Sequence, residues 1–205
     1  MKDPKIFLLV CEYFADEVAA VIGAEEFDDV DMASFPAHCA KQTTWDSLKK
    51  IVPPQNEYGS VQILISCCAA ALGTPPHGLE HCHVYKLEQC FHLIAGRNIV
   101  EAYQKEGAYV LSPGWLAHWR DRMEQWGFDQ KMAREFLGKS AVKLLLLNTG
   151  VDEKSSDRLA EFSSFVSLPF EKLPVGLDFI RLFLYKIVYS TRLENEKAKR
   201  TRALA

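Results

Sequence analysis

The chain has 205 residues, a formal net charge of −3, and 48% hydrophobic and 25% charged residues. These values are typical of a globular protein with one main domain, and the net charge gives no electrostatic reason to expect nucleic acid as a partner. No apolar run approaches the ~18–20 residues needed to cross a bilayer, and the apolar run at 6–11 is too short for a signal peptide. We therefore expect a soluble, cytoplasmic protein that does not bind membranes.

In the first half of the chain, apolar runs of strand length alternate with amphipathic stretches of helix length. Strands are predicted at 6–10, 29–35, 60–66 and 82–85, with helices at 13–22 and 44–51 between them. This alternation is typical of a parallel sheet that helices cover on both faces.

The second half continues the same alternation. Helices are predicted at 87–95 and 99–105, separated at Gly96, and strands at 108–111, 142–147 and 165–168. Ser112 and Pro113 begin a further helix as N-cap and first helical residue, and another helix is predicted at 155–162. The fold class that we expect is a Rossmann-like, three-layer αβα architecture with a mostly parallel sheet of five or six strands.

A long C-terminal helix is predicted from Gly176 onward. Its first half is apolar and its second half, from Arg192 to Arg202, is almost wholly polar. Such a helix is either a frayed tail or a connector that docks at its start and projects as a coiled coil toward an output module. We divide the chain into an α/β domain at 1–175 and this helix at 176–205, and we expect a parallel homodimer through the helix.

Cysteines follow three of the predicted strands. Cys11 closes the first strand, Cys67 and Cys68 close the third, and Cys90 follows the fourth. Ligands of open α/β sheets bind beyond the carboxyl ends of the strands, so neighbouring strands would bring these thiols into one crevice. Three thiolates suit zinc, iron or an iron-sulfur cluster. The alternative is that each cysteine is a buried apolar side chain.

Histidines around Cys82 offer weaker metal ligands. His81 and His83 face one side of a strand while Cys82 faces the other, so the three cannot serve one ion unless the segment is a loop. The alternative is a loop with exposed histidines. His38 and Cys39, after the second strand, are a weaker pair of the same kind.

Several segments together resemble the domain of unknown function family 1638. The resemblance runs from about Ile6 to Leu184 and is most specific at Tyr109–Trp115. It rests on Cys11-Glu12, Cys67-Cys68, Gln89-Cys90, Leu93-Ile-Ala-Gly96, Gly107-Ala-Tyr-Val-Leu-Ser-Pro-Gly-Trp115, Leu147-Asn-Thr-Gly150 and Gly176-Leu-Asp-Phe-Ile-Arg-Leu.

The resemblance implies a Rossmann-like domain associated with anaerobes, corrinoid-dependent methyl transfer and signalling modules. It adds Trp115 to the strand-end cysteines as a candidate cofactor-binding residue. The chain departs from the family pattern at Cys68-Ala-Ala-Ala, where members have Cys-Gly-Asn-Gly, and at Glu88-Gln89, where they have His-Asp. Close approach of the backbone to a ligand, the usual use of such glycines, is therefore in doubt.

No catalytic residue can be assigned, because the sequence lacks a phosphate-binding glycine loop, a serine elbow and zinc-protease or Cys-x-x-Cys motifs. We expect a sensory input domain that binds a small molecule, metal or corrinoid and signals through the last helix to an output module such as a histidine kinase. The alternative is an enzyme or accessory protein of corrinoid-dependent methyl transfer, partnered with methyltransferase components, that uses a cysteine-bound metal.

Overall fold

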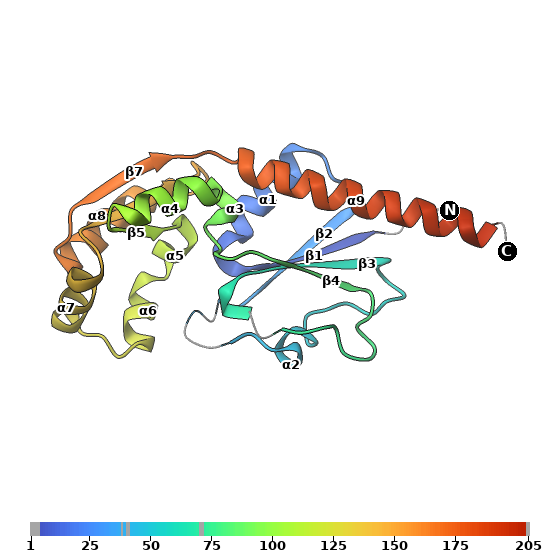
Figure 1. Cartoon of the computed structure of the whole chain (residues 1–205), viewed down its shortest axis with the longest axis horizontal. Helices are drawn as coiled ribbons and strands as arrows, with labels where there is room; N and C mark the ends of the chain where they lie inside the picture. The colour runs from blue at the N-terminus through green and yellow to red at the C-terminus, as the bar shows by residue number, and fades with distance from the viewer. Residues whose placement is uncertain (1–4, 38, 40–41, 70–71, 204–205) are drawn as a thin grey trace. The chain divides into compact units, whose positions relative to one another are not determined.

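The computed structural model describes residues 5–37, 39, 42–69 and 72–203 (Figure 1). The chain divides into two compact units. The first contains residues 1–90 and 180–205, and the second contains residues 91–179. Each unit has its own parallel sheet. The chain enters the second unit after residue 90 and returns to the first after residue 179, in the first turn of the C-terminal helix.

The first unit contains a four-stranded sheet. Its strands are β1 (Ile6–Cys11), β2 (Val30–Phe35), β3 (Ser60–Ile65) and β4 (Cys82–Lys86), in the spatial order β2-β1-β3-β4. All three strand pairs are parallel. The first, third and fourth strands are therefore neighbours, which is the condition under which their cysteines would converge, and the carboxyl ends of all four strands lie at one edge.

The two central strands of this sheet, β1 and β3, are buried on both faces, as the continuous apolar runs predicted. Alternate residues of β1 and β3, such as Phe7, Leu9 and Ile63, join a core cluster with Leu48 of the short helix α2 (Trp45–Leu48). Beyond β1 follow the 3-10 turn η1 (Glu12–Phe14) and the helix α1 (Ala15–Ala24), and a second 3-10 turn, η2 (Cys67–Ala69), follows β3. Residues on strands alternate between faces because successive side chains point to opposite sides.

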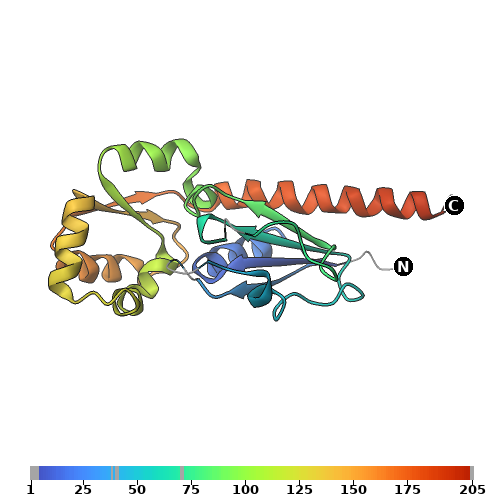
Figure 2. The ribbon, with the colours of Figure 1, turned by 60° about the horizontal axis from the view of Figure 1, so that its bottom comes forward.

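Helix α9 (Asp178–Ala203) packs on the first unit from residue 180 onward (Figure 2). Its buried residues recur at helical spacing and are Ile180, Leu184, Ile187, Val188 and Thr191. Tyr185 packs edge-on against Phe27, which precedes β2, and Phe183 packs against Tyr85 of β4. Residues 180–191 of the helix therefore pack against the sheet of the first unit.

The second unit contains a three-stranded parallel sheet in the order β5-β6-β7. Its strands are β5 (Ala108–Leu111), β6 (Lys143–Asn148) and β7 (Phe170–Pro174), and its helices are α3 (His92–Ala95), α4 (Arg97–Lys105), α5 (Pro113–Ala117), α6 (Trp119–Gln125), α7 (Gln130–Ser140) and α8 (Ser155–Val166). Four consecutive leucines of β6, Leu144–Leu147, are wholly buried at its centre. Phe162 of α8 packs against Trp115 and Trp119.

The α/β class, the parallel strands and the long C-terminal helix are confirmed, but the sheets are smaller than the five or six strands expected. They have four and three strands. The strand expected at 165–168 is wrong, because Phe165 and Val166 complete helix α8 and Ser167 ends it in the left-handed conformation. The last strand instead lies at 170–174. Within the described residues, no helix is long and apolar enough to cross a membrane.

Candidate functional site

Each strand of the four-stranded sheet leads into a segment that carries a cysteine. Cys11 is the last residue of β1, Cys39 follows β2, Cys68 lies in η2 directly after β3, and Cys90 follows β4. Because the strands are parallel and adjacent, these segments all lie at the carboxyl edge of the sheet, where α/β proteins bind their ligands. The edge is the candidate site.

Backbone and side-chain hydrogen bonds connect the segments that carry these cysteines. The Glu12 carboxylate accepts a hydrogen bond from the backbone N–H of Ala37, 2.8 Å away, and so joins the end of β1 to the segment after β2. The backbone N–H of Thr43 donates to the carbonyl of Cys68 at 2.8 Å, which joins that segment to the one after β3.

The segment after β3 is in turn joined to the end of β4. The Lys86 ammonium donates to the carbonyl oxygen of Leu72 at 2.5 Å, and the backbone N–H of Leu87 donates to the carbonyl of Ile65 at 2.8 Å. The cysteine-bearing segments thus form one connected layer over the sheet edge.

The Cys11 thiol is electrostatically coupled to the other three. Burial raises the pKa of Cys11 well above the usual range, and a hydrogen bond from the backbone N–H of Tyr13 lowers it in part. Negative charge on Cys68, Cys90 or Cys39 raises that pKa further, because like charges disfavour a second thiolate. Cys11 is accordingly a protonated thiol at neutral pH whose ionisation is sensitive to charge on three other thiols.

The four thiols differ in their surroundings. Cys11 is half-buried and packs against the core cluster of the sheet. Cys68 and Cys90 are also half-buried, and the Cys68 sulfur lies 3.7 Å from the Ser66 hydroxyl. Cys39 is exposed. Solvent therefore reaches the Cys39 thiol.

The donor set suits a thiophilic metal ion. Thiolates bind zinc, iron and iron-sulfur clusters, and the thiols must lose their protons when such a metal binds. Within the described ranges, no three Cys, His, Asp or Glu side chains already stand as a metal-binding group. Cys67, predicted together with Cys68, lies in η2, but its side chain falls outside the described part of the structure.

Cys82, His81 and His83 lie at the opposite edge of the same sheet. Cys82 is the first residue of β4, pairs with Val61 at the start of β3, and is buried in the core cluster. The five residues of β4 separate it from the carboxyl edge by ~13 Å at the usual rise. The structure therefore does not bring this segment to the strand-end thiols.

The two histidines also differ from each other. His81 is buried, and its Nε2 lies 3.2 Å from the carbonyl oxygen of Pro53, whereas His83 is exposed on β4. His38 lies outside the described residues.

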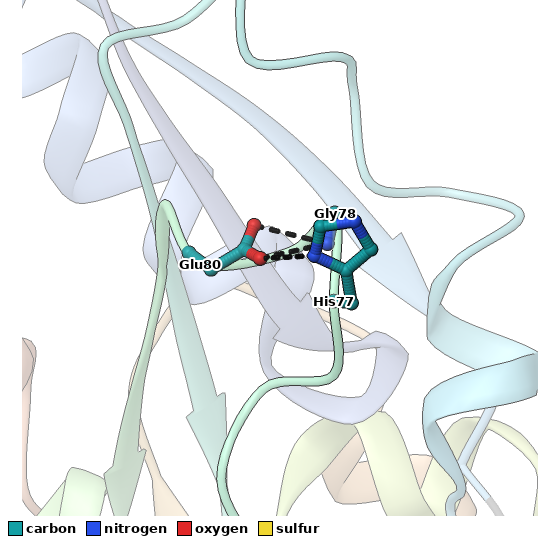
Figure 3. A network of polar contacts seen from close by, with 3 residues as sticks. All are labelled: His77, Gly78 and Glu80. Carbon is teal, nitrogen blue, oxygen red and sulfur yellow. Dashed lines mark hydrogen bonds and ion pairs between the residues drawn. The ribbon is translucent and has the colours of Figure 1, made fainter.

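The polar residues just before β4 form a turn rather than a ligand set (Figure 3). Both Glu80 carboxylate oxygens accept from the backbone N–H of Gly78 at 3.0 Å, and the His77 ring lies 2.9 Å from the same carboxylate. Gly78 has a φ of 87°, which glycine adopts at little cost. Glu80 and His77 thus stabilise the entry to β4.

Trp115, predicted from the family resemblance, belongs to the second unit. It is buried, and its ring centroid lies 5.2 Å from that of Phe162 and 6.2 Å from that of Tyr109. The Ser112 hydroxyl accepts a hydrogen bond from the backbone N–H of Trp115 at 3.2 Å, as expected of an N-cap. Trp115 is thus part of an aromatic core.

Cys39 is the residue to which the sequence gave too little weight. The sequence predicts it, together with His38, only as a weaker pair of possible ligands. The rule that selected Cys11, Cys68 and Cys90, a cysteine soon after a parallel strand, applies equally to Cys39 after β2. Charge on Cys39 would also raise the pKa of Cys11, as charge on Cys68 and Cys90 would.

The fold and this edge define an α/β protein with a cysteine-bearing carboxyl edge on a parallel sheet. The sequence profile of the family described as "Protein of unknown function (DUF1638)" matches residues 46–184, so the chain belongs to this family. The match starts later than the resemblance near Ile6 suggested. It includes Cys68, Cys90 and Trp115, while Cys11 and Cys39 precede it. A comparison with curated proteins finds no match.

Proposed function

We propose that the first unit is a sensory input domain in which a thiophilic metal centre binds at the strand-end cysteines. Its ligands are Cys11, Cys68 and Cys90, with Cys39 as the fourth thiol. The observation that carries the proposal is that four adjacent parallel strands lead into segments with Cys11, Cys39, Cys68 and Cys90 at one end of the sheet, where charge on the other three would raise the pKa of Cys11. Zinc, iron or an iron-sulfur cluster suits such a set, and a corrinoid is the other cofactor that the family resemblance suggests.

Burial of Cys11 fits a role as a metal ligand better than a role as a free nucleophile. A thiol with a raised pKa is protonated at neutral pH and reacts slowly, since the thiolate is the reactive form. A bound cation stabilises thiolates, so metal binding would overcome the cost of ionising this group. The metal site would then form only when the ion is present, as a sensor requires.

Helix α9 offers the route by which binding reaches an output module. It packs on the same unit that carries the cysteines, and a ligand can bias it only through differential affinity for two arrangements. We expect hydrogen exchange of α9 amides to differ between the metal-free and metal-loaded protein. Identical exchange in both states would count against signalling through this helix.

Metal analysis and ultraviolet-visible spectroscopy of anaerobically purified protein test the site itself. We expect bound metal in the wild type and its loss in Cys11→Ala, Cys68→Ala and Cys90→Ala. Cys82→Ala is the matched control, because it removes a thiol of the same sheet at the opposite edge. A folded wild-type protein that binds neither zinc nor ferrous iron after reconstitution would contradict the proposal.

The second candidate is an enzyme or accessory protein of corrinoid-dependent methyl transfer. The protonated state of Cys11 favours a version in which a bound metal, rather than burial, activates the thiol. Methyl transfer to or from the metal-loaded protein, lost in Cys11→Ala and Cys90→Ala with the fold intact, would favour this candidate. Metal binding without turnover would favour the sensor.

A further inference from the structure

Helix α9 carries a second apolar row on the face opposite the one that packs on the first unit. Leu182, Tyr189 and Leu193 are 68%, 50% and 57% exposed, respectively. The buried row, which includes Leu184 and Thr191, lies two residues away from the exposed row, about half a turn around the helix. Large apolar side chains aligned on an exposed helix face mark an interaction surface.

The exposed row continues with charged residues at the same spacing. It consists of Leu182, Lys186, Tyr189, Leu193, Glu196 and Arg200, which follow one another at alternating steps of four and three residues. This is the spacing at which helices pair in a coiled coil. Lys186 and Glu196 are exposed, and neither makes an ion pair within the part of the chain that the structure describes.

We propose that this row is the contact surface for α9 of a second copy of the chain, and that the two helices run antiparallel. In a two-fold symmetric pair centred near Thr191, Tyr189 packs against Leu193 of the partner subunit, and Lys186 lies opposite Glu196 of the partner subunit. Symmetry repeats each contact with the roles reversed. Leu182 then lies against the aliphatic part of the partner's Arg200.

Charge decides the orientation. A parallel in-register pair sets Lys186 against Lys186 of the partner subunit, Glu196 against Glu196 of the partner subunit, and Arg200 against Arg200 of the partner subunit. Like charges in facing positions of paired helices are destabilising. The antiparallel pair replaces these with two lysine–glutamate pairs, so the parallel dimer expected from the sequence is the less favourable arrangement. The inference does not rest on the cysteine site, and metal binding is measured separately.

Sedimentation velocity of the full chain over a concentration series tests the pairing. We expect the mass to rise from that of a 23.2 kDa monomer toward that of a dimer. Leu193→Asp should leave a monomer at all concentrations, because it places a charge in the central layer. Glu194→Lys is the control, since Glu194 lies off the row, near enough to Tyr85 to raise the pKa of that phenol. It should leave association unchanged.

Charge exchange tests the direction. K186E and E196K alone should each weaken dimerisation about tenfold, because two attractive pairs become repulsive. The double variant K186E/E196K should restore it. In a parallel pair, like charges face each other in every one of these variants, so none would differ from the wild type. That result, or a wild type that is monomeric throughout, would overturn the proposal, and circular dichroism confirms that each variant is folded.

Discussion

At the scale of single residues, position relative to the sheet separates the cysteines into two kinds. Cys82 starts β4 and lies within the core cluster, where it behaves as an apolar side chain. Cys11 and Cys39 lie at the other edge, in segments that hydrogen bonds join together. The same residue type therefore has a structural role at one end of a strand and is available for chemistry at the other.

This difference predicts an order of alkylation in the folded protein. Exposed Cys39 should react first, and buried Cys82 should react much more slowly. Burial raises the pKa of Cys82 to about 11 from an ordinary value of 9.0. A thiol with the higher pKa carries about a hundredth of the thiolate at neutral pH, and only the thiolate reacts. Peptide mass spectrometry after timed exposure to iodoacetamide measures the order.

The denatured protein is the control for this order, because all of its cysteines should react at similar rates. Modification of Cys82 as fast as Cys39 in the native state would contradict the burial on which the assignment depends.

At the scale of elements, ion pairs fasten α9 to the segment between α1 and β2. The Arg192 guanidinium donates to both carboxylate oxygens of Asp29, at 2.9 and 2.5 Å. About two and three turns earlier on α9, the Tyr185 hydroxyl and the Arg181 guanidinium, the latter at 2.6 Å, donate to the Glu25 carboxylate. These contacts hold the helix beyond the end of its apolar first half.

Removal of the distal pair should loosen that part of the helix. We expect Arg192→Ala to cost ~0.5–1 kcal/mol locally, since the pair is partly exposed, and to speed amide exchange near residue 192 about two- to fivefold. Arg192→Lys should restore only part of the protection, because an ammonium cannot form the paired contact. Lys197→Ala, an exposed change on the same helix outside the proposed contact row, is the control.

The same pair predicts a dependence on acid. The hydrogen bond from Arg192 holds the pKa of Asp29 below its ordinary value of 3.8. A carboxyl group whose pKa is lower in the folded than in the unfolded protein stabilises the fold at pH values above its unfolded-state pKa. This contribution is lost as the pH falls through its folded-state pKa. Protection of the distal helix should be constant down to about pH 4 and fall below it, and Asp29→Asn should remove this dependence.

The elements show which structural features the sequence could reveal. Strands β1, β3 and β6 are continuous buried apolar runs, so their periodicity and length define them within a residue or two. Strand β7 alternates between exposed and half-buried residues at a sheet edge and contains Glu171 and Lys172, so no apolar run marks it. Helix α7 was missed for a similar reason, since Met132 and Phe136 are exposed and only Ala133 and Leu137 are buried.

The candidate site could be predicted from the sequence only to the extent that the order of the strands in the sheet could be predicted. That the segments of Cys11, Cys68 and Cys90 lie at one end of the sheet follows from the parallel order β1-β3-β4, which could be stated from the sequence only as a condition. His81 and Cys82 lie away from the strand-end thiols because they occupy the first end of β4. The strand predicted at 82–85 is accurate enough to show this. The extra thiol of Cys39 depends on β2 lying beside β1, a pairing that no local pattern specifies.

At the scale of the whole molecule, the chain order conceals two separate cores. The first unit is discontinuous in sequence, because helix α9 in residues 180–205 packs on the sheet formed by residues 1–90. The second unit, residues 91–179, is continuous and has its own sheet and aromatic core. A single large sheet, as the alternation of elements suggested, would have joined both sets of strands.

This division predicts unequal behaviour of two fragments. A fragment of residues 91–179 should fold alone and unfold cooperatively, because its buried leucines and tryptophans contact each other. A fragment of residues 1–90 should not, since it lacks Ile180, Leu184, Ile187 and Val188, which cover its sheet. Denaturant unfolding followed by circular dichroism and tryptophan fluorescence measures both.

The matched control is the first unit with its helix restored, made by replacing residues 91–179 with a flexible linker. Because α9 supplies the missing apolar face, this protein should regain cooperative unfolding and, if the strand-end cysteines form the metal site, should also bind metal. Cooperative folding of residues 1–90 without α9 would show that the helix is an attachment rather than part of the core, and would remove the physical basis for coupling it to the cysteines.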